Sequence, residues 1–155
     1  MRSFFDSNVL VYALSSQDTD KRLQALSLIG QASAQRALVV STQVLVETFN
    51  VLTRKCDVLA RDALDALRLL TPRCEVVVPD AAAVLRALEL AVEHSLSPWD
   101  GLIVQAALLG DCSQLYTVDM QHGRRFGGLQ ILNPFLASAN QPPAAATAAP
   151  RRRKR

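Results

Sequence analysis

Cysteine is scarce in this sequence. Only three cysteines occur among 155 residues, and no two of them form a Cys-x-x-Cys pair. An odd number of widely spaced cysteines excludes a disulfide framework and argues against a cysteine zinc site. We therefore expect Cys56, Cys74 and Cys112 to be ordinary buried thiols of a reducing compartment.

Long hydrophobic runs are also missing. No apolar run reaches the ~18 residues that a membrane span needs, and Asp6 interrupts the N-terminus before a signal-peptide core could form. Hydrophobic residues nonetheless make up 50% of the chain, which is enough for one globular domain with a sizeable core. We expect a cytoplasmic protein with no membrane partner.

Several catalytic motifs are absent as well. There is no Gly-x-x-x-x-Gly-Lys loop for nucleoside triphosphates. The N-terminal motif, Asp6-Ser7-Asn8, lacks the second aspartate of an Asp-x-Asp phosphatase, and neither histidine belongs to a His-Glu-x-x-His zinc motif. His122 follows Asp119 closely, where it could orient a substrate or be only a polar loop side chain.

Positive charge is concentrated at one end of the chain. The formal net charge is +3, but the last five residues are all basic; without them the chain carries 12 Lys+Arg against 14 Asp+Glu. After Phe135 the sequence turns to Ala, Pro, Thr, Ser, Asn and Gln with no periodicity. We predict one folded domain at 1–136 and a disordered Ala/Pro-rich extension at 137–155 that ends in the basic cluster.

Short apolar runs alternate with longer helical patterns along the predicted domain. This alternation indicates an α/β domain with a mostly parallel sheet. We expect about five strands, at 3–5, 37–40, 75–78, 115–118 and 129–132. We expect helices at about 8–14, 18–34, 42–55, 58–70, 80–94 and 97–109.

Four acidic residues lie in or beside apolar segments that contain no lysine or arginine: Asp6, Glu47, Asp100 and Asp119. A buried carboxylate is costly unless it is protonated, paired or bound to a cation. Two carboxylates ~4 Å apart repel by roughly 4 kcal/mol at an effective dielectric of ~20. A shared Mg²⁺ or Mn²⁺, both of which prefer oxygen ligands, would remove this penalty.

Each of these acids also has a purely structural interpretation. Asp100 could be a helix-capping acid in Ser97-Pro98-Trp99-Asp100, although it shares a helix face with Ile103 and Val104 that should point inward. Glu47 could be a solvated surface side chain, although its neighbours are apolar. Asp6 and Asp119 could be turn residues or caps, but both follow strands, and ligands of open parallel sheets bind beyond the carboxyl ends of the strands.

The chemistry that this acidic set favours is phosphodiester hydrolysis. A hard cation polarises the phosphate, lowers the pKa of a bound water and stabilises the departing oxygen. Arg124 and Arg125, close to Asp119 in sequence, are candidates for contacting a substrate phosphate, or ordinary surface charges. The basic cluster at 151–155 could bind nucleic-acid phosphates by counterion release, or be a solvated terminus with no specific role.

Over about residues 2–135 the chain resembles the PIN-domain ribonucleases, specifically the VapC-type toxins of toxin–antitoxin pairs. The resemblance rests on the order and spacing of five motifs: Asp6-Ser7-Asn8, Glu47 in Val-x-x-Glu-x-x-x-Val, Ser97-x-x-Asp100, Thr117-Val118-Asp119 and Leu132-Asn133-Pro134-Phe135. It implies a three-layer α/β/α sandwich and a PIN-like nuclease domain at 1–136. The extension beyond Phe135 departs from the usual compact toxin.

The resemblance also implies the roles of individual residues. Asp6, Asp100 and Asp119 would hold Mg²⁺ or Mn²⁺, and Glu47 would position or deprotonate the attacking water. Asn8 and Thr117 would support the pocket by hydrogen bonding. The expected partners are an RNA substrate, a small protein antitoxin that covers the active-site groove, and a second copy in a homodimer.

Three hypotheses of function remain open from the sequence. The first is an endoribonuclease toxin, for which all four acids are present. The second is a nuclease of RNA processing or repair that has no antitoxin. The third is a non-catalytic RNA-binding module that keeps the acidic pocket for metal-dependent stability.

Overall fold

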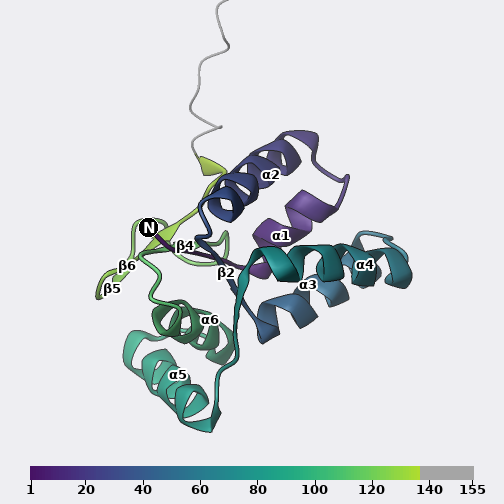
Figure 1. Ribbon diagram of the computed structural model, residues 1–155. Helices are drawn as coiled ribbons and strands as arrows, with labels where there is room; N and C mark the ends of the chain where they lie inside the picture. Colours follow the sequence, from purple (N-terminus) through teal and green to yellow (C-terminus); the bar gives the residue numbers. More distant parts are fainter. Residues whose placement is uncertain (137–155) are drawn as a thin grey trace, which may run out of the picture.

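The computed structural model describes residues 1–136 and has an α/β architecture (Figure 1). Six strands form one sheet in the order β3-β2-β1-β4-β6-β5. All neighbouring strands are parallel except β5 and β6, which are antiparallel. The predicted fold class is therefore confirmed. The predicted extension at 137–155 lies outside the described residues.

The strands are short and mostly buried. Their bounds are β1 Ser3–Phe5, β2 Leu38–Ser41, β3 Glu75–Val77, β4 Gln114–Tyr116, β5 Arg125–Phe126 and β6 Leu129–Leu132. The sequence predicted all of these except β5, which at two residues is too short to produce an alternating pattern. Gly127, at φ 58° in the turn between β5 and β6, has a left-handed conformation that glycine adopts without strain.

The helices agree closely with the predicted ranges. Their bounds are α1 Ser7–Leu14, α2 Thr19–Ala34, α3 Thr42–Lys55, α4 Ala60–Leu70, α5 Ala81–His94 and α6 Pro98–Leu109, with a 3₁₀ turn η1 at Thr71–Arg73. Side-chain N-caps fix most of the starts, because an oxygen of the cap accepts a backbone N–H of the first turn. The caps are Asp6, Asp18, Ser41, Asp80 and Ser97.

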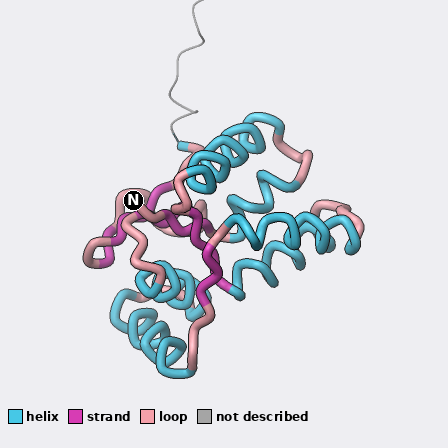
Figure 2. The backbone as a smooth tube through the Cα atoms, viewed as in Figure 1, coloured by secondary structure: helices cyan, strands magenta, loops and turns pink. Residues whose placement is uncertain are grey.

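The helices cover both faces of the sheet. Figure 2 shows the strands as a central layer, with α1 and α2 above it and α5 and α6 below it in this view. The chain runs outward from β1 to β2 and β3, then crosses back over α5 and α6 to β4 on the other side of β1. The right-handedness of such crossovers requires the two sets of helices to lie on opposite faces.

This strand order places a topological switch point at β1, which pairs with both β2 and β4. In open α/β sheets the crevice beyond the carboxyl ends of the strands at such a point is the usual binding site. The residues that follow β1 and β4 are Asp6 and Thr117 to Asp119. The fold therefore brings two of the predicted acidic motifs to one edge.

Helices α5 and α6 pack unusually closely. A Cβ added to Gly101 would collide with the backbone carbonyl oxygen of Ala87 and would meet Ala91 Cβ at 3.1 Å. The small residues at this crossing hold the start of α6 against α5. They thereby fix the position of Trp99 and Asp100, which precede Gly101 in the first turn.

The cysteines differ in part from the prediction. All three are free, but only Cys112 is buried, whereas Cys56 and Cys74 are half-buried. Both half-buried thiols lie at element ends, Cys56 after α3 and Cys74 before β3, where packing is less complete. Among residues 1–136, no helix has the length and apolar character that a membrane span requires.

Candidate active site at the carboxyl edge of the sheet

Asp6 lies at the centre of the candidate site. It follows β1, is 3% exposed, and caps α1 by accepting the backbone N–H of Ser7 at 2.7 Å. The hydroxyl of Thr117 donates to its other carboxylate oxygen at 2.7 Å, and the amide of Asn8 donates to that same oxygen at 3.3 Å. All of these donors are neutral, so the carboxylate is bound but not neutralised.

The pKa of Asp6 reflects this environment. Burial raises the pKa of the carboxyl group to about 6, and the negative charges of Asp119 and Glu47 raise it further, while the hydrogen bonds from Thr117 and Ser7 act in the opposite direction. Desolvation by burial is the largest of these causes. A carboxylate with a strongly raised pKa in a crevice is a recognised mark of a functional site.

Asn8 joins Asp6 to Asp119. The side-chain nitrogen of Asn8 donates to Asp119 Oδ2 at 3.0 Å, and the side-chain oxygen Oδ1 of Asn8 accepts the backbone N–H of Val118 at 3.3 Å. Thr117 Oγ1 in turn accepts the backbone N–H of Asp119 at 3.2 Å. The segments that follow β1 and β4 are therefore fastened together, and Asp119, which is exposed, is held beside the buried Asp6.

Glu47 reaches the same cluster from α3. It is half-buried rather than solvated, and its two carboxylate oxygens accept hydrogen bonds from Ser7 Oγ at 3.2 Å and Gln43 Nε2 at 2.8 Å. Sequence reasoning assigned no role to Ser7 or Gln43. The spacing of four between Gln43 and Glu47 was the available signal, because residues i and i+4 are neighbours on a helix.

Asp100 is placed differently from the other three acids. It is half-buried in the first turn of α6, where its backbone N–H donates to the cap Ser97 at 3.0 Å. No hydrogen bond or ion pair within residues 1–136 joins its carboxylate to the other acids. A helix that leads into a parallel strand starts at the carboxyl edge of the sheet, so Asp100 shares this edge with the other acids.

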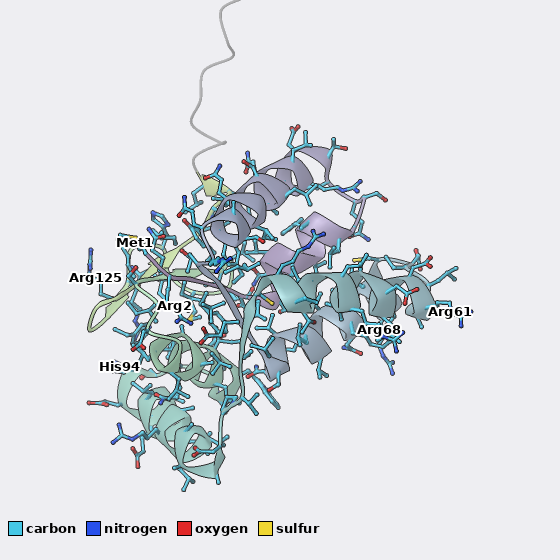
Figure 3. All side chains as sticks on the ribbon, viewed as in Figure 1. Met1, Arg2, Arg61, Arg68, His94 and Arg125 are labelled. Atoms are coloured by element: carbon cyan, nitrogen blue, oxygen red, sulfur yellow. The ribbon has the colours of Figure 1, made fainter. Side chains whose placement is uncertain are left out.

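The three basic or histidine candidates near Asp119 in sequence make their contacts outside the acidic cluster. Arg124 donates to the backbone carbonyl of His94 at 2.9 Å and lies over the Phe126 ring at 4.8 Å. Arg125 is exposed on β5, far to the left in Figure 3. His122 Nδ1 accepts the backbone N–H of Asn133 at 3.0 Å, which is a structural turn contact.

Strand register explains the position of Arg125. Arg125 pairs with Gln130, Gln130 with Gln114, and Gln114 with Ser3, so Arg125 lies level with the start of β1 rather than with Asp6. The chain turns back after Asp119 to form the β5–β6 hairpin, which carries the arginines toward the amino edge. Their closeness to Asp119 in sequence therefore does not place them beside the carboxylates.

The acidic set is suited to a hard cation. Its donors are all oxygens, and the raised pKa of Asp6 means that a nearby cation would relieve an existing penalty. Within residues 1–136 no three His, Cys, Asp or Glu side chains converge into a ready-made metal site. Mg²⁺ commonly binds through one or two carboxylates and keeps several waters, so Asp6 with Asp119 suffices as a donor set.

The family of this protein follows from its sequence. Residues 3–125 match the PIN domain, which is most of the described chain. The chain therefore belongs to the PIN domain family. No curated relative matches the sequence significantly.

Several solved structures with the same fold come from toxin–antitoxin systems. The chain is 24% identical to Mycobacterium tuberculosis VapC20, a sarcin-ricin loop cleaving toxin, with a TM-score of 0.63 over 76% of this chain and 89% of that one. It is 18% identical to a chain of a toxin–antitoxin complex from Klebsiella pneumoniae, with a TM-score of 0.62 over 85% and 97%. It is also 18% identical to a chain of VapBC2 from Rickettsia felis, which was solved bound to a promoter DNA fragment, with a TM-score of 0.62 over 84% of this chain and 97% of that one.

Proposed function

We propose that this protein is a metal-dependent endoribonuclease that hydrolyses phosphodiester bonds in RNA. One observation carries the proposal: Asp6, buried at the switch point of the sheet, is linked through neutral donors to Asp119 and Glu47. Membership of the PIN domain family supports the same reaction class. The proposed catalytic acids are Asp6, Glu47, Asp100 and Asp119.

Each proposed role has a physical basis in this chain. Asp6 and Asp119 would hold Mg²⁺ or Mn²⁺, and Asp100 would reach the ion directly or through water from the start of α6. When bound, the cation polarises the phosphate and supplies an activated water. Glu47, fixed by Ser7 and Gln43, would orient that water and accept its proton.

Asn8 and Thr117 would set the geometry of the ligands. Both touch Asp6, and both also contact the segment that carries Asp119. Hydrogen-bonding partners of metal ligands orient them and tune the metal. The proposal therefore assigns these two residues to support rather than to chemistry.

We further propose that the enzyme is the toxin of a toxin–antitoxin pair, acting in the cytoplasm as a homodimer. The similar structures from Klebsiella pneumoniae and Rickettsia felis come from toxin–antitoxin assemblies, and VapC20 is a sarcin-ricin loop cleaving toxin. A small protein antitoxin that covers the site is the expected partner. Light scattering of the purified chain would test the dimer.

The decisive experiment is a cleavage assay on total cellular RNA. Wild type and Asp6→Asn would be compared with Mg²⁺, with Mn²⁺ and with EDTA, and the cut ends mapped by sequencing. We expect discrete cuts that require both the metal and Asp6. Intact RNA from a preparation free of co-purified inhibitor would refute the nuclease.

A non-catalytic RNA-binding module is the second candidate. The observation that favours it is the lack of a ready-made metal site of three converging His, Cys, Asp or Glu side chains within residues 1–136. It predicts that metal binds and raises the melting temperature while RNA stays intact. A thermal shift alone would not discriminate, because a cation that binds the folded state stabilises it in either case.

A nuclease of RNA processing or repair without an antitoxin would share the chemistry of the first proposal. The two differ in their biology, since only a toxin should arrest growth when expressed alone and be rescued by a small neighbouring gene product. Growth arrest by wild type but not by Asp100→Asn would favour the toxin.

A further inference from the structure

Trp99 is the only tryptophan of the chain, and it is 65% exposed. It occupies the first turn of α6, between the proline that starts the helix and Asp100. Its ring has no aromatic or cationic partner and its indole N–H no hydrogen bond within residues 1–136. A large, flat, apolar side chain is thus left open to solvent at a fixed position.

A mostly apolar groove surrounds this indole. Val46 of α3, Val84 of α5 and Leu102 of α6 line it together with Pro79, and Val46 is itself 69% exposed. Gln43 and Glu47 form its polar side. The groove is therefore built from three helices and includes a member of the acidic cluster.

Glu47 connects the groove to the candidate active site. Ser7 Oγ lies 3.2 Å from one of its carboxylate oxygens and also contacts Asp6, so the groove begins where the acidic cluster ends. A nucleic-acid strand whose phosphate reaches Asp6 would carry an adjacent base into this groove. An unpaired base has an apolar face that an exposed aromatic ring can cover.

We propose that Trp99 stacks on an unpaired base of the RNA next to the cleaved phosphate. The inference rests on the proposed nuclease function and adds a residue that binds the substrate. Stacking does not depend on backbone charge, which suits a groove that borders carboxylates and has no basic side chain in its lining. Trp99 is thus a binding residue, with Val46 and Val84 as the apolar walls.

The single tryptophan makes the test direct, because all indole emission of the protein comes from position 99. The Asp6→Asn protein would be titrated, with Mg²⁺ present, with oligo(A) and with an abasic ribose-phosphate chain of the same length. Anisotropy of labelled RNA would report binding separately. We expect oligo(A) to quench Trp99 emission and the abasic chain to bind without quenching.

Substitutions give an independent measurement. Trp99→Leu should weaken oligo(A) binding and raise KM about tenfold, within the range measured for losing one stacked base, with kcat within about twofold. Trp99→Phe should retain most of the affinity. Val92→Ala, an exposed apolar position on α5 outside the groove, is the matched control and should change neither.

The possible outcomes separate this inference from the proposed function. Bound oligo(A) that leaves Trp99 emission unchanged, or a Trp99→Leu protein with wild-type KM, would overturn stacking while leaving the nuclease intact. Trp99 emission that shifts with protein concentration alone, or only when an antitoxin is added, would show that another protein surface covers Trp99. Either result would also overturn the proposal that Trp99 stacks on a base. Quenching by oligo(A) without any cleavage by wild type would support stacking and refute the nuclease.

Discussion

The charged side chains at the two edges of the sheet have different kinds of partner. At the amino edge, Arg2 forms an ion pair with Glu75, and Ser3 Oγ donates to Gln114 at 3.1 Å. Glu75 raises the pKa of the Arg2 guanidinium, as expected for a paired base. At the carboxyl edge, the partners of Asp6, Glu47 and Asp119 within residues 1–136 are all hydroxyl, amide and backbone donors.

The difference indicates which edge was shaped by folding and which by function. An ion pair or a neutral hydrogen bond satisfies the folded state without outside help. Three acids gathered without a counter-charge lower the stability of the folded state, and an external cation or substrate would offset this cost. The polar residues of the amino edge are therefore structural, and the carboxyl edge is the one to alter when function is tested.

The largest expected effect comes from a matched pair of substitutions, Glu47→Gln and Glu75→Gln. Glu47→Gln removes the proposed proton acceptor while leaving a side chain that Ser7 and Gln43 can still contact, so kcat should fall about 10²–10⁴-fold. Glu75→Gln removes an acid of the same size at the amino edge and should leave kcat within about twofold. Steady-state cleavage of a mapped RNA substrate would measure both.

An equal loss of activity in both variants would contradict this contrast. It would mean that the Glu75 ion pair transmits strain to the site, or that Glu47 acts only through stability. Melting temperatures of the two variants would separate these explanations, since only a stability effect lowers both melting temperature and activity.

The second prediction concerns the stability of the metal-free protein. The pKa of Asp6 is raised to about 6 in the folded state, from a value near 4 in an unfolded chain. Below pH ~4 the group is protonated in both states. Between about pH 4 and 6 the unfolded chain releases this proton while the folded state retains it, so folding stability falls with pH and levels off above the folded pKa. Wild type should therefore lose stability relative to Asp6→Asn between pH 4 and 7, by up to about 3 kcal/mol.

Denaturant unfolding in EDTA at several pH values would measure this difference. Adding Mg²⁺ at pH 7 should reduce it, because the cation stabilises the ionised carboxylate. Glu75→Gln is again the control. The difference in unfolding free energy between this variant and wild type should not grow between pH 4 and 7 as the difference for Asp6→Asn does. If the difference in unfolding free energy between wild type and Asp6→Asn does not vary with pH, then burying the ionised Asp6 carboxylate carries no cost.

Much of this contrast was predictable from the sequence. Buried strands and capped helices left clear local signals, so α3 was predicted at its observed bounds and Ser97 as the cap of α6. The convergence of Asp6 and Asp119 followed from a general property of parallel sheets. The two-residue strand β5 was missed because so short a segment has no periodicity.

The rest depends on tertiary placement. Arg124 and Arg125 are close to the acids in sequence, but the β5–β6 hairpin places Arg125 level with the start of β1. Arg124 donates instead to the backbone carbonyl of His94. Asp100 lies on the helix face of Ile103 and Val104, both buried, yet its place in the first turn leaves it half-buried. The roles of Ser7 and Gln43 appear only once Glu47 is seen to face Asp6.

A smaller effect is expected from the residues that hold the acids. Asn8→Ala removes the amide that joins Asp6 to Asp119, and loss of such a supporting contact typically costs about 10–100-fold in metal affinity or activity. The counterpart at the amino edge is Ser3→Ala, which removes the bond to Gln114 and should lower stability without changing metal affinity. Titration calorimetry with Mn²⁺ would compare them, and equal affinity of Asn8→Ala and wild type would remove Asn8 from the site.

The smallest effect is expected from the terminal basic cluster, in which all five residues from 151 to 155 are positively charged. Replacing Arg151 to Arg155 with glutamine removes five charges; if all five contact phosphates, the slope of log affinity against log salt should fall by at most about 3 to 4 for single-stranded RNA. At physiological salt we expect only a few-fold weaker binding and an unchanged kcat, since the chemistry lies at Asp6. The control is Arg61→Gln with Arg68→Gln, two exposed arginines in the first and last turns of α4 (Figure 3), which should leave the slope unchanged. An identical slope for wild type and the glutamine tail would mean that RNA is held by the carboxyl edge and its groove alone, and that the basic cluster takes no part in recruiting it.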